Sequence, residues 1–392
     1  MVELKTKYFR TEKLFLLYGG NCLDKDEGFL YKTYSIILLL YCNLYLFVVS
    51  FDLLSQNFND AVNGWFYTLN AIYDTSIAVF GYIGRKRLGK IMKKLEQPPF
   101  IADIDRGNVE EENKMLNAWS SFFKTQVYAV LSGAFVIISY RLLSSIIKRY
   151  FYSERILPWS QITLLNGNSS PTYEILWICQ NSVFFYFCFS TIPLVSITIG
   201  ILSLMNVQFQ ILHNYLKRIL QLSRDSKNAD NLSFDVLNSH IKKAVTYHLE
   251  IYKMIQDIDG IFNGAFLCVF MITWILICLD IYQASLMPNV NLKQFFLLME
   301  VMTVFTPALV YCYYGEELAH RSEQIGEIAY EIDFVGTDIR FQRSLMIILR
   351  QSQKPFRIKA GKMIEGSMAV VVWVLRSSFS AYMMIRTINT PS

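Results

Sequence analysis

Seven apolar stretches, each long enough to cross a lipid bilayer, limit what this chain can fold into. A hydrocarbon core of about 30 Å needs roughly 20 mostly apolar residues per helix. Charged residues make up only 18% of the chain, whereas soluble proteins carry about 25%. We therefore predict an all-α, polytopic membrane protein with seven transmembrane helices, at residues 35–55, 65–84, 126–147, 174–205, 258–286, 293–315 and 363–386.

The positions of Lys and Arg predict how these helices are oriented. Of the 37 Lys and Arg residues, 30 fall on one side of the predicted membrane, in segments 1–34, 85–125, 206–257 and 317–362. The opposite side holds only Lys148, Arg149, Arg155 and Lys293. Cytosolic segments are enriched in basic residues, so we expect a cytosolic N-terminus and an extracellular C-terminus. This orientation is the reverse of that of a G-protein-coupled receptor.

The spans and the segments between them divide the chain into six regions. Residues 1–34 form a cytosolic N-terminal segment, and residues 35–205 hold the first four spans, with a long outer loop at 148–173. The other regions are a cytosolic helical extension (206–257), spans five and six (258–316), a cytosolic anchor helix (317–362), and the seventh helix with a short outer tail (363–392).

The cytosolic segments have the pattern of packed helices. In 232–257 mostly apolar residues recur every three or four positions, at Phe234, Leu237, Ile241, Val245, His248, Tyr252 and Ile255. Such a stripe needs an apolar partner, so we predict a helical bundle beneath the membrane. That partner is either another part of the same chain or a second subunit.

The outer loop 148–173 is long enough to fold over the mouth of a cavity. Its apolar residues Ile156, Leu157, Trp159 and Leu164 predict that it packs on the helices. The sequon beginning at Asn168 lies in this loop, which makes Asn168 a candidate glycosylation site.

Charged residues inside the predicted spans are candidates for function, because each costs at least ~2.5 kcal/mol at the centre of a bilayer. They are Asp74, Arg141, Asp280, Glu300 and Arg376, with Asp52 near the end of a span. Arg141 has two candidate partners, Asp280 and Glu300. The pair either fixes the register of two helices or anchors a polar group beside a ligand cavity.

Aromatic residues are dense toward the outer side of the membrane. Large apolar walls with sparse polar groups are typical of a small-molecule pocket, and also of interhelical packing with an interfacial aromatic belt. The residues that suggest a pocket are Phe66, Asn70 and Tyr73 in the second span, Trp177, Asn181, Phe184 and Phe185 in the fourth, and Phe295, Phe296, Met299 and Met302 in the sixth.

The last span carries small and hydroxyl residues at helical spacing, including Ser377, Ser378, Ser380 and Ala381. Such residues allow close helix packing. They also suit a water-filled path closed by an apolar constriction at Met384, Ile385 or Ile388, which would gate by dewetting. The sequence leaves both interpretations open.

Other functional classes have little support in the sequence. The four histidines are scattered, and the chain has no HExxH, GxSxG or phosphate-binding glycine loop, so we expect neither an enzyme nor a cofactor nor a metal. The seven cysteines have no CxxC spacing and fall mostly in apolar segments, which argues against a disulfide framework. A transporter would need internal repeats, and we find none. The distribution of charge favours a membrane protein rather than a nucleic-acid-binding one.

The C-terminal part of the chain resembles the signature of insect odorant receptors. The matching elements occur in the family's order, at Tyr311-Cys312-Tyr313-Tyr314-Gly315, Ser322, Ala329-Tyr330, Arg350-Gln351-Ser352-Gln353-Lys354-Pro355, Ala360-Gly361 and Ser378-Phe379-Ser380-Ala381-Tyr382. Two positions depart from it. Phe334 stands where the family often has Trp, and Tyr382-Met383-Met384-Ile385-Arg386 differs from the usual end of the last helix. Gustatory receptors share the topology, but their Thr-Tyr signature is not found in the last helix.

The resemblance implies a ligand-gated, non-selective cation channel of four subunits in the plasma membrane of olfactory sensory neurons, with no requirement for a G protein. The compact 206–257 segment favours an odorant-tuning subunit, whose partners would be the insect odorant co-receptor, a volatile organic ligand, permeating cations and the lipid membrane.

The resemblance places the ligand among the second, third, fourth and sixth spans, so the candidate ligand-binding residues are Phe66, Asn70, Tyr73, Ile137, Tyr140, Arg141, Ser144, Trp177, Asn181, Phe184, Phe185, Phe296 and Met299. The corresponding pore residues are Ser377, Ala381, Met384, Ile385 and Ile388.

Overall fold

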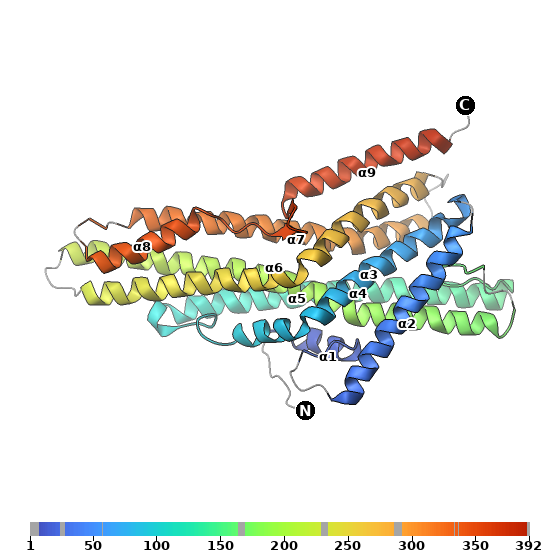
Figure 1. Ribbon diagram of the computed structural model, residues 1–392, viewed down its shortest axis with the longest axis horizontal. Helices are drawn as coiled ribbons and strands as arrows, with labels where there is room; N and C mark the ends of the chain where they lie inside the picture. The colour runs from blue at the N-terminus through green and yellow to red at the C-terminus, as the bar shows by residue number, and fades with distance from the viewer. Residues whose placement is uncertain are drawn as a thin grey trace.

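Long helices make up almost all of the computed structural model (Figure 1), which confirms the all-α class. It describes residues 8–23, 28–56, 58–163, 169–228, 234–285, 292–332, 334–335 and 337–389. The helices are α1 (Arg10–Tyr18), α2 (Phe29–Leu54), α3 (Phe58–Lys94), α4 (Val109–Tyr152), α5 (Thr172–Asn228), α6 (Phe234–Ser285), α7 (Leu292–Glu331), α8 (Ile339–Ser352) and α9 (Met368–Asn389). A 3-10 turn (Ile104–Arg106) and a two-stranded antiparallel hairpin, β1 (Lys359–Ala360) with β2 (Ile364–Glu365), complete the described elements.

The seven predicted spans fall on α2 to α7 and α9. Within the described residues, α2, α4, α5 and α6 are long and apolar enough to cross a membrane by length and composition, and Met368–Met384 of α9 is a shorter apolar helix. The outward side chains of α2 are strongly apolar, at Ile37, Leu40, Leu44 and Phe47. Exposed apolar surface of this extent marks contact with lipid or with another protein, as expected for a multi-pass membrane protein.

One end of the molecule extends beyond α2 and α9 (Figure 1). We call this part the bundle; it consists of α8 and of the adjoining parts of α5, α6 and α7, at 206–224, 235–257 and 317–331. The predicted stripe on α6 is buried here, including Ile241 and Ile255, and α8 packs against α6 with Phe341, Leu345 and Ile348 buried. The stripe therefore finds its apolar partner in the same chain.

Three local features differ from the sequence-based expectation. Helix α1 was not expected, and it packs against α5. The segment 317–362, expected as one anchor helix, is divided into the end of α7, the separate helix α8 and the hairpin strand β1. The last helix begins at Met368, because residues 359–365 form the hairpin instead of its first turn.

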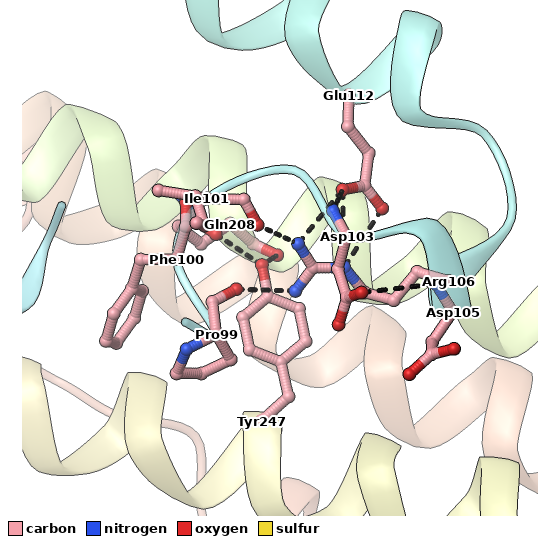
Figure 2. Close-up of polar contacts among 9 residues, drawn as sticks. All are labelled: Pro99, Phe100, Ile101, Asp103, Asp105, Arg106, Glu112, Gln208 and Tyr247. Carbon is pink, nitrogen blue, oxygen red and sulfur yellow. Dashed lines mark hydrogen bonds and ion pairs between the residues drawn. The ribbon is translucent and has the colours of Figure 1, made fainter. Parts of the chain in front are cut away.

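The loop between α3 and α4 is held by the buried side chain of Arg106 (Figure 2). Its guanidinium donates to both carboxylate oxygens of Glu112, with Nη2 to Oε2 at 2.9 Å and Nε to Oε1 at 3.0 Å. It also donates to the backbone carbonyls of Pro99 and Ile101. The Tyr247 ring of α6 lies 4.6 Å from the guanidinium carbon. These bonds satisfy a buried cation and fix this loop against α6.

Candidate functional site

Arg141 pairs with Glu300, one of its two predicted partners. Nη2 of Arg141 on α4 lies 2.6 Å from Oε1 of Glu300 on α7, and Nε lies 2.9 Å from the same oxygen. The Tyr67 hydroxyl of α3 donates to the other carboxylate oxygen at 3.3 Å, and its ring lies 5.1 Å from the Arg141 guanidinium. A buried ion pair with these additional contacts connects three helices at one point.

The described part of the chain between α4 and α5 packs over this point, as its apolar residues predict. The Trp159 ring stacks on Phe184 of α5 with centroids 3.8 Å apart, and its indole N–H donates to Asn181 at 3.3 Å. The end of the described loop is attached to α2, because the backbone N–H and the hydroxyl of Thr163 both donate to the Asp52 carboxylate. Residues 153–163 of this loop are therefore held against α2 and α5 and cover the helices at this point.

These contacts join into one group, which we call the Tyr67 cluster. The Tyr67 ring meets the Trp159 ring edge-on at 5.9 Å and the Phe66 ring at 5.2 Å. The ring of Tyr140 on α4 stacks on the ring of Phe296 on α7, with centroids 3.5 Å apart. Tyr140 directly precedes Arg141, and Phe296 precedes Glu300 by four residues, one helical turn. The cluster comprises Phe66, Tyr67, Tyr140, Arg141, Trp159, Asn181, Phe184, Phe296 and Glu300. Aromatic walls around a few fixed polar groups are the chemistry of a small-molecule site.

The structure brings six of the predicted ligand-binding residues into this cluster: Phe66, Tyr140, Arg141, Asn181, Phe184 and Phe296. Phe185 is not among them, since it lies on the outer face of α5 with 41% of its surface exposed. Trp177 donates to Ser145 at 3.1 Å rather than to the neighbouring Ser144. Tyr73 and Ile137 are buried, while Asn70, which donates to the carbonyl of Phe66, and Met299 are half-buried.

Three members of the cluster were absent from the predicted set of ligand-binding residues. Tyr67 follows Phe66 in the sequence, and the pattern did not show which side of α3 faces its neighbours. Glu300 is predicted from the sequence as a partner for Arg141, in a pair that either fixes helix register or anchors a polar group beside a cavity. Trp159 is predicted from the sequence only as an apolar residue of the outer loop. Its position over Phe184 results from a contact between distant segments, which helical periodicity does not predict.

Asp280, the other predicted partner of Arg141, is buried on α6. Neither of its carboxylate oxygens has a hydrogen-bond partner within the part of the chain that the structure describes. Unpartnered buried polar groups are uncommon in proteins. Within the described residues, Arg141 thus forms its ion pair with Glu300 and not with Asp280.

Helix α9 packs mainly on α6, along one stripe, and also contacts α7. The stripe contains Val371, Val374, Ser378 and Tyr382, and the Ser378 hydroxyl donates to the Trp274 carbonyl at 3.2 Å. Of the predicted pore residues, Ser377 and Ala381 are half-buried beside this stripe and Met384 is exposed. The side chains of Ile385 and Ile388, like residue Asn168, lie outside the described parts of the structure.

Comparison with known proteins identifies the family. The family model described as "7tm Odorant receptor" matches residues 57–379, most of the chain. The chain belongs to the odorant receptor family. The receptor is 23% identical over 309 residues to putative odorant receptor 85d of Drosophila melanogaster, covering 77% of this chain and 72% of that one. It is 25% identical over 361 residues to odorant receptor 85c of the same fly, covering 88% and 86%.

The receptor also has the fold of a solved insect olfactory receptor. Its similarity to the structure of OR5 from Machilis hrabei in complex with eugenol has a TM-score of 0.79, with 96% of this chain and 97% of that chain covered. The two sequences are only 11% identical, so the likeness establishes the fold alone. That fold and the family together confirm the predicted seven-helix membrane architecture.

Proposed function

We propose that the receptor binds a volatile organic ligand at the Tyr67 cluster and is the odorant-tuning subunit of a ligand-gated, non-selective cation channel. The observation that supports this most is the Arg141–Glu300 pair held under the Trp159 cover. The cluster combines aromatic surface, which buries an apolar ligand body, with a cation that keeps 23% of its side-chain surface exposed. A carbonyl or hydroxyl oxygen on the ligand is a suitable acceptor for that cation.

The packed cluster also suggests how binding is linked to opening. Trp159 and Phe184 occupy the space between the loop and α5, so a ligand must separate their rings to enter. Glu300 sits on α7, and α7 and α6 both contact α9. A ligand that binds better to one arrangement of these helices shifts the equilibrium toward it. We assign the pore to the face of α9 that carries Ser377, Ala381, Met384, Ile385 and Ile388.

The bundle supplies a surface for assembly. Its outward side chains include the exposed apolar residues Tyr330, Ile339, Met346 and Ile347. Contiguous exposed apolar surface supports contact with another subunit. We propose a heterotetramer with the insect odorant co-receptor in the plasma membrane of olfactory neurons, with a cytosolic N-terminus, an extracellular C-terminus and a glycosylation site at Asn168.

The deciding experiment records current from cells that express this chain with and without an insect odorant co-receptor during an odorant panel. The proposal predicts an odorant-evoked cation current only when both are present. Current from this chain alone would contradict the need for a partner. Silence with both subunits at the surface, across a panel of esters, ketones, alcohols and aromatics, would contradict the proposed ligand class.

A further inference from the structure

A cleft of about 380 Å³ lies at the junction between the bundle and α9. This volume is within the range of roughly 300–1,000 Å³ that is common for small-molecule sites. The cleft is separate from the Tyr67 cluster and is lined by Tyr252, Gln256, Gln351, Lys354, Pro355, Phe356, Arg357, Lys359 and Glu365.

The cleft is predominantly basic. Lys354, Arg357 and Lys359 line it, and Lys362 follows in the turn of the hairpin, so four cations fall within nine consecutive residues, and all four are exposed. Glu365 opposes them, with its carboxylate 3.0 Å from Arg357 and 4.0 Å from Lys359. Asp259 of α6 also interacts electrostatically with Lys359 and Lys362. The four cations exceed these two carboxylates, which leaves a net positive charge.

The hairpin, which carries Lys359 and Lys362, is fixed to α6. The backbone N–H of Gly361, which has a positive φ of 62°, donates to the Asn263 carbonyl of α6 at 3.0 Å. The Asn263 side chain in turn donates to the Lys359 carbonyl at 2.6 Å. Lys359 and Lys362 are therefore presented by a backbone that is bonded to α6.

The hairpin directly precedes α9, a predicted membrane helix. Met368, the first residue of α9, follows β2 by three residues, and its backbone N–H donates to Glu316 of α7 at 2.7 Å. At the tip of the hairpin, Met363 has 82% of its surface exposed beside Lys362. An exposed apolar side chain next to basic residues, immediately before a membrane helix, suits contact with lipid headgroups.

We propose that this cleft binds the phosphorylated inositol headgroup of a phosphoinositide lipid. Clustered Lys and Arg next to a membrane helix, on the side that the charge distribution predicts to be cytosolic, attract such headgroups. Arginine and lysine both bind phosphate through charge-assisted hydrogen bonds. A phosphate would displace Glu365 from Arg357 at little cost, because a solvent-exposed ion pair contributes little to stability.

We favour a lipid over a soluble phosphate compound because of the position of Met363. A bound headgroup would sit at the base of α9, whose start is bonded to α7 through Glu316. The site would therefore connect lipid composition to the helix to which we assign the pore. The binding test below does not depend on an odorant or on current.

The test measures binding of a fluorescent, short-chain phosphatidylinositol bisphosphate to the full-length receptor in phosphatidylcholine nanodiscs. The cleft variant combines Lys354→Gln, Arg357→Gln and Lys359→Gln. Each basic residue near a lipid headgroup contributes about fivefold to the binding affinity. The cleft variant lacks three of them, so we expect it to bind about a hundredfold more weakly. The conservative variant, with Lys354→Arg, Arg357→Lys and Lys359→Arg, keeps the charge and is expected to bind normally.

A matched control removes the same charge from exposed residues at the far end of the bundle, with Lys242→Gln, Arg340→Gln and Arg343→Gln. It is expected to bind like the unaltered receptor. Equal loss in the cleft and control variants would show that only net charge matters and would overturn the site. Full competition by soluble inositol trisphosphate at equal concentration, or equal binding of phosphatidylserine, would overturn the assignment to a phosphoinositide lipid.

Discussion

Arg141 and Glu300 join α4 to α7 through an ion pair with an N···O distance of 2.6 Å, and the two partners are unequally covered. The Glu300 side chain keeps only 7% of its surface exposed, whereas Arg141 keeps 23%. The Tyr67 hydroxyl donates to the second carboxylate oxygen, so both oxygens of Glu300 already accept hydrogen bonds from the protein. The guanidinium retains free donor capacity on its exposed side, which makes it the member of the pair that an incoming ligand can reach.

Removing one partner of this pair should be costly. Arg141→Ala leaves the Glu300 carboxylate buried without its cation, and we expect a loss of about 3 kcal/mol in stability. The double change Arg141→Met with Glu300→Leu removes both charges and should recover much of that loss. Thermal unfolding of the purified receptor in detergent measures this. A double variant as unstable as the sum of the two single changes would contradict a direct pair.

Two adjacent phenylalanines offer a matched test of the ligand site. Phe184 stacks on Trp159, whereas Phe185 lies on the outer face of α5. We expect Phe184→Ala to raise the half-maximal odorant concentration about tenfold, because the bound ligand loses an aromatic contact that contributes about 1.4 kcal/mol. Phe185→Ala should leave the dose response unchanged. Dose–response currents with the co-receptor measure both, and equal shifts would remove Phe184 from the site.

The seven spans could be located from the sequence because a bilayer demands long apolar stretches. The errors lie where local pattern is ambiguous. Met363 and Ile364 are apolar and continue naturally into Met368, so they were assigned to the last helix. The structure instead turns the chain at Gly361 and pairs Ile364 with Ala360. Gly315 of α7 approaches the carbonyl of Gly366 so closely that a Cβ would lie 2.9 Å from it, a contact between segments that periodicity does not reveal.

Six of the residues proposed from the sequence lie in the Tyr67 cluster, because dense aromatic sequence marks the parts of α3, α4, α5 and α7 that meet there. The sequence pattern did not single out Tyr67, Trp159 or Glu300 as ligand-binding residues, and the assignment of a ligand to this cluster is a proposal. To predict that Tyr67 rather than Asn70, or Ser145 rather than Ser144, faces the neighbouring helices, one must know how each helix is rotated about its axis. That rotation is set by packing between segments more than a hundred residues apart, such as Arg141 with Glu300. The orientation of the termini remains a prediction from the distribution of Lys and Arg.

The Arg106 contact should require a guanidinium. Arg106 bonds the Glu112 carboxylate and two backbone carbonyls at once, and a lysine ammonium cannot match that planar set of donors. We expect Arg106→Lys to lower stability by about 2 kcal/mol, the range of a lost hydrogen bond to a charged group. Arg343→Lys, at an exposed position on α8, should have no effect. Thermal unfolding compares the two, and equal melting temperatures would show that charge alone suffices.

His248 should make the bundle sensitive to acid. Burial lowers its pKa from the usual 6.5 to about 4, since its ring is enclosed by Phe209 and Tyr252. The unfolded chain therefore binds a proton more readily than the folded one as pH falls below about 6.5. Stability should drop by up to about 3 kcal/mol by about pH 4.

The test of His248 compares the melting temperature of the receptor with that of His248→Phe at neutral and acidic pH. The variant loses this titration, so its melting temperature should fall less on acidification. His213 and His240 are present in both proteins and contribute equally to both. Parallel pH dependence of the two proteins would show that His248 is not the responsible group.

Two adjacent methionines test the proposed pore face of α9. Met384 follows Ser377 by seven residues and shares its face, whereas Met383 follows Phe379 by four and points to another face. If Met384 contributes to an apolar constriction that closes by dewetting, Met384→Ala should widen it and raise the current without odorant. Met383→Ala removes the same side-chain volume and should leave that current unchanged. Whole-cell recording with the co-receptor, at matched surface expression, compares the two, and identical basal currents would place the gate on another face of α9.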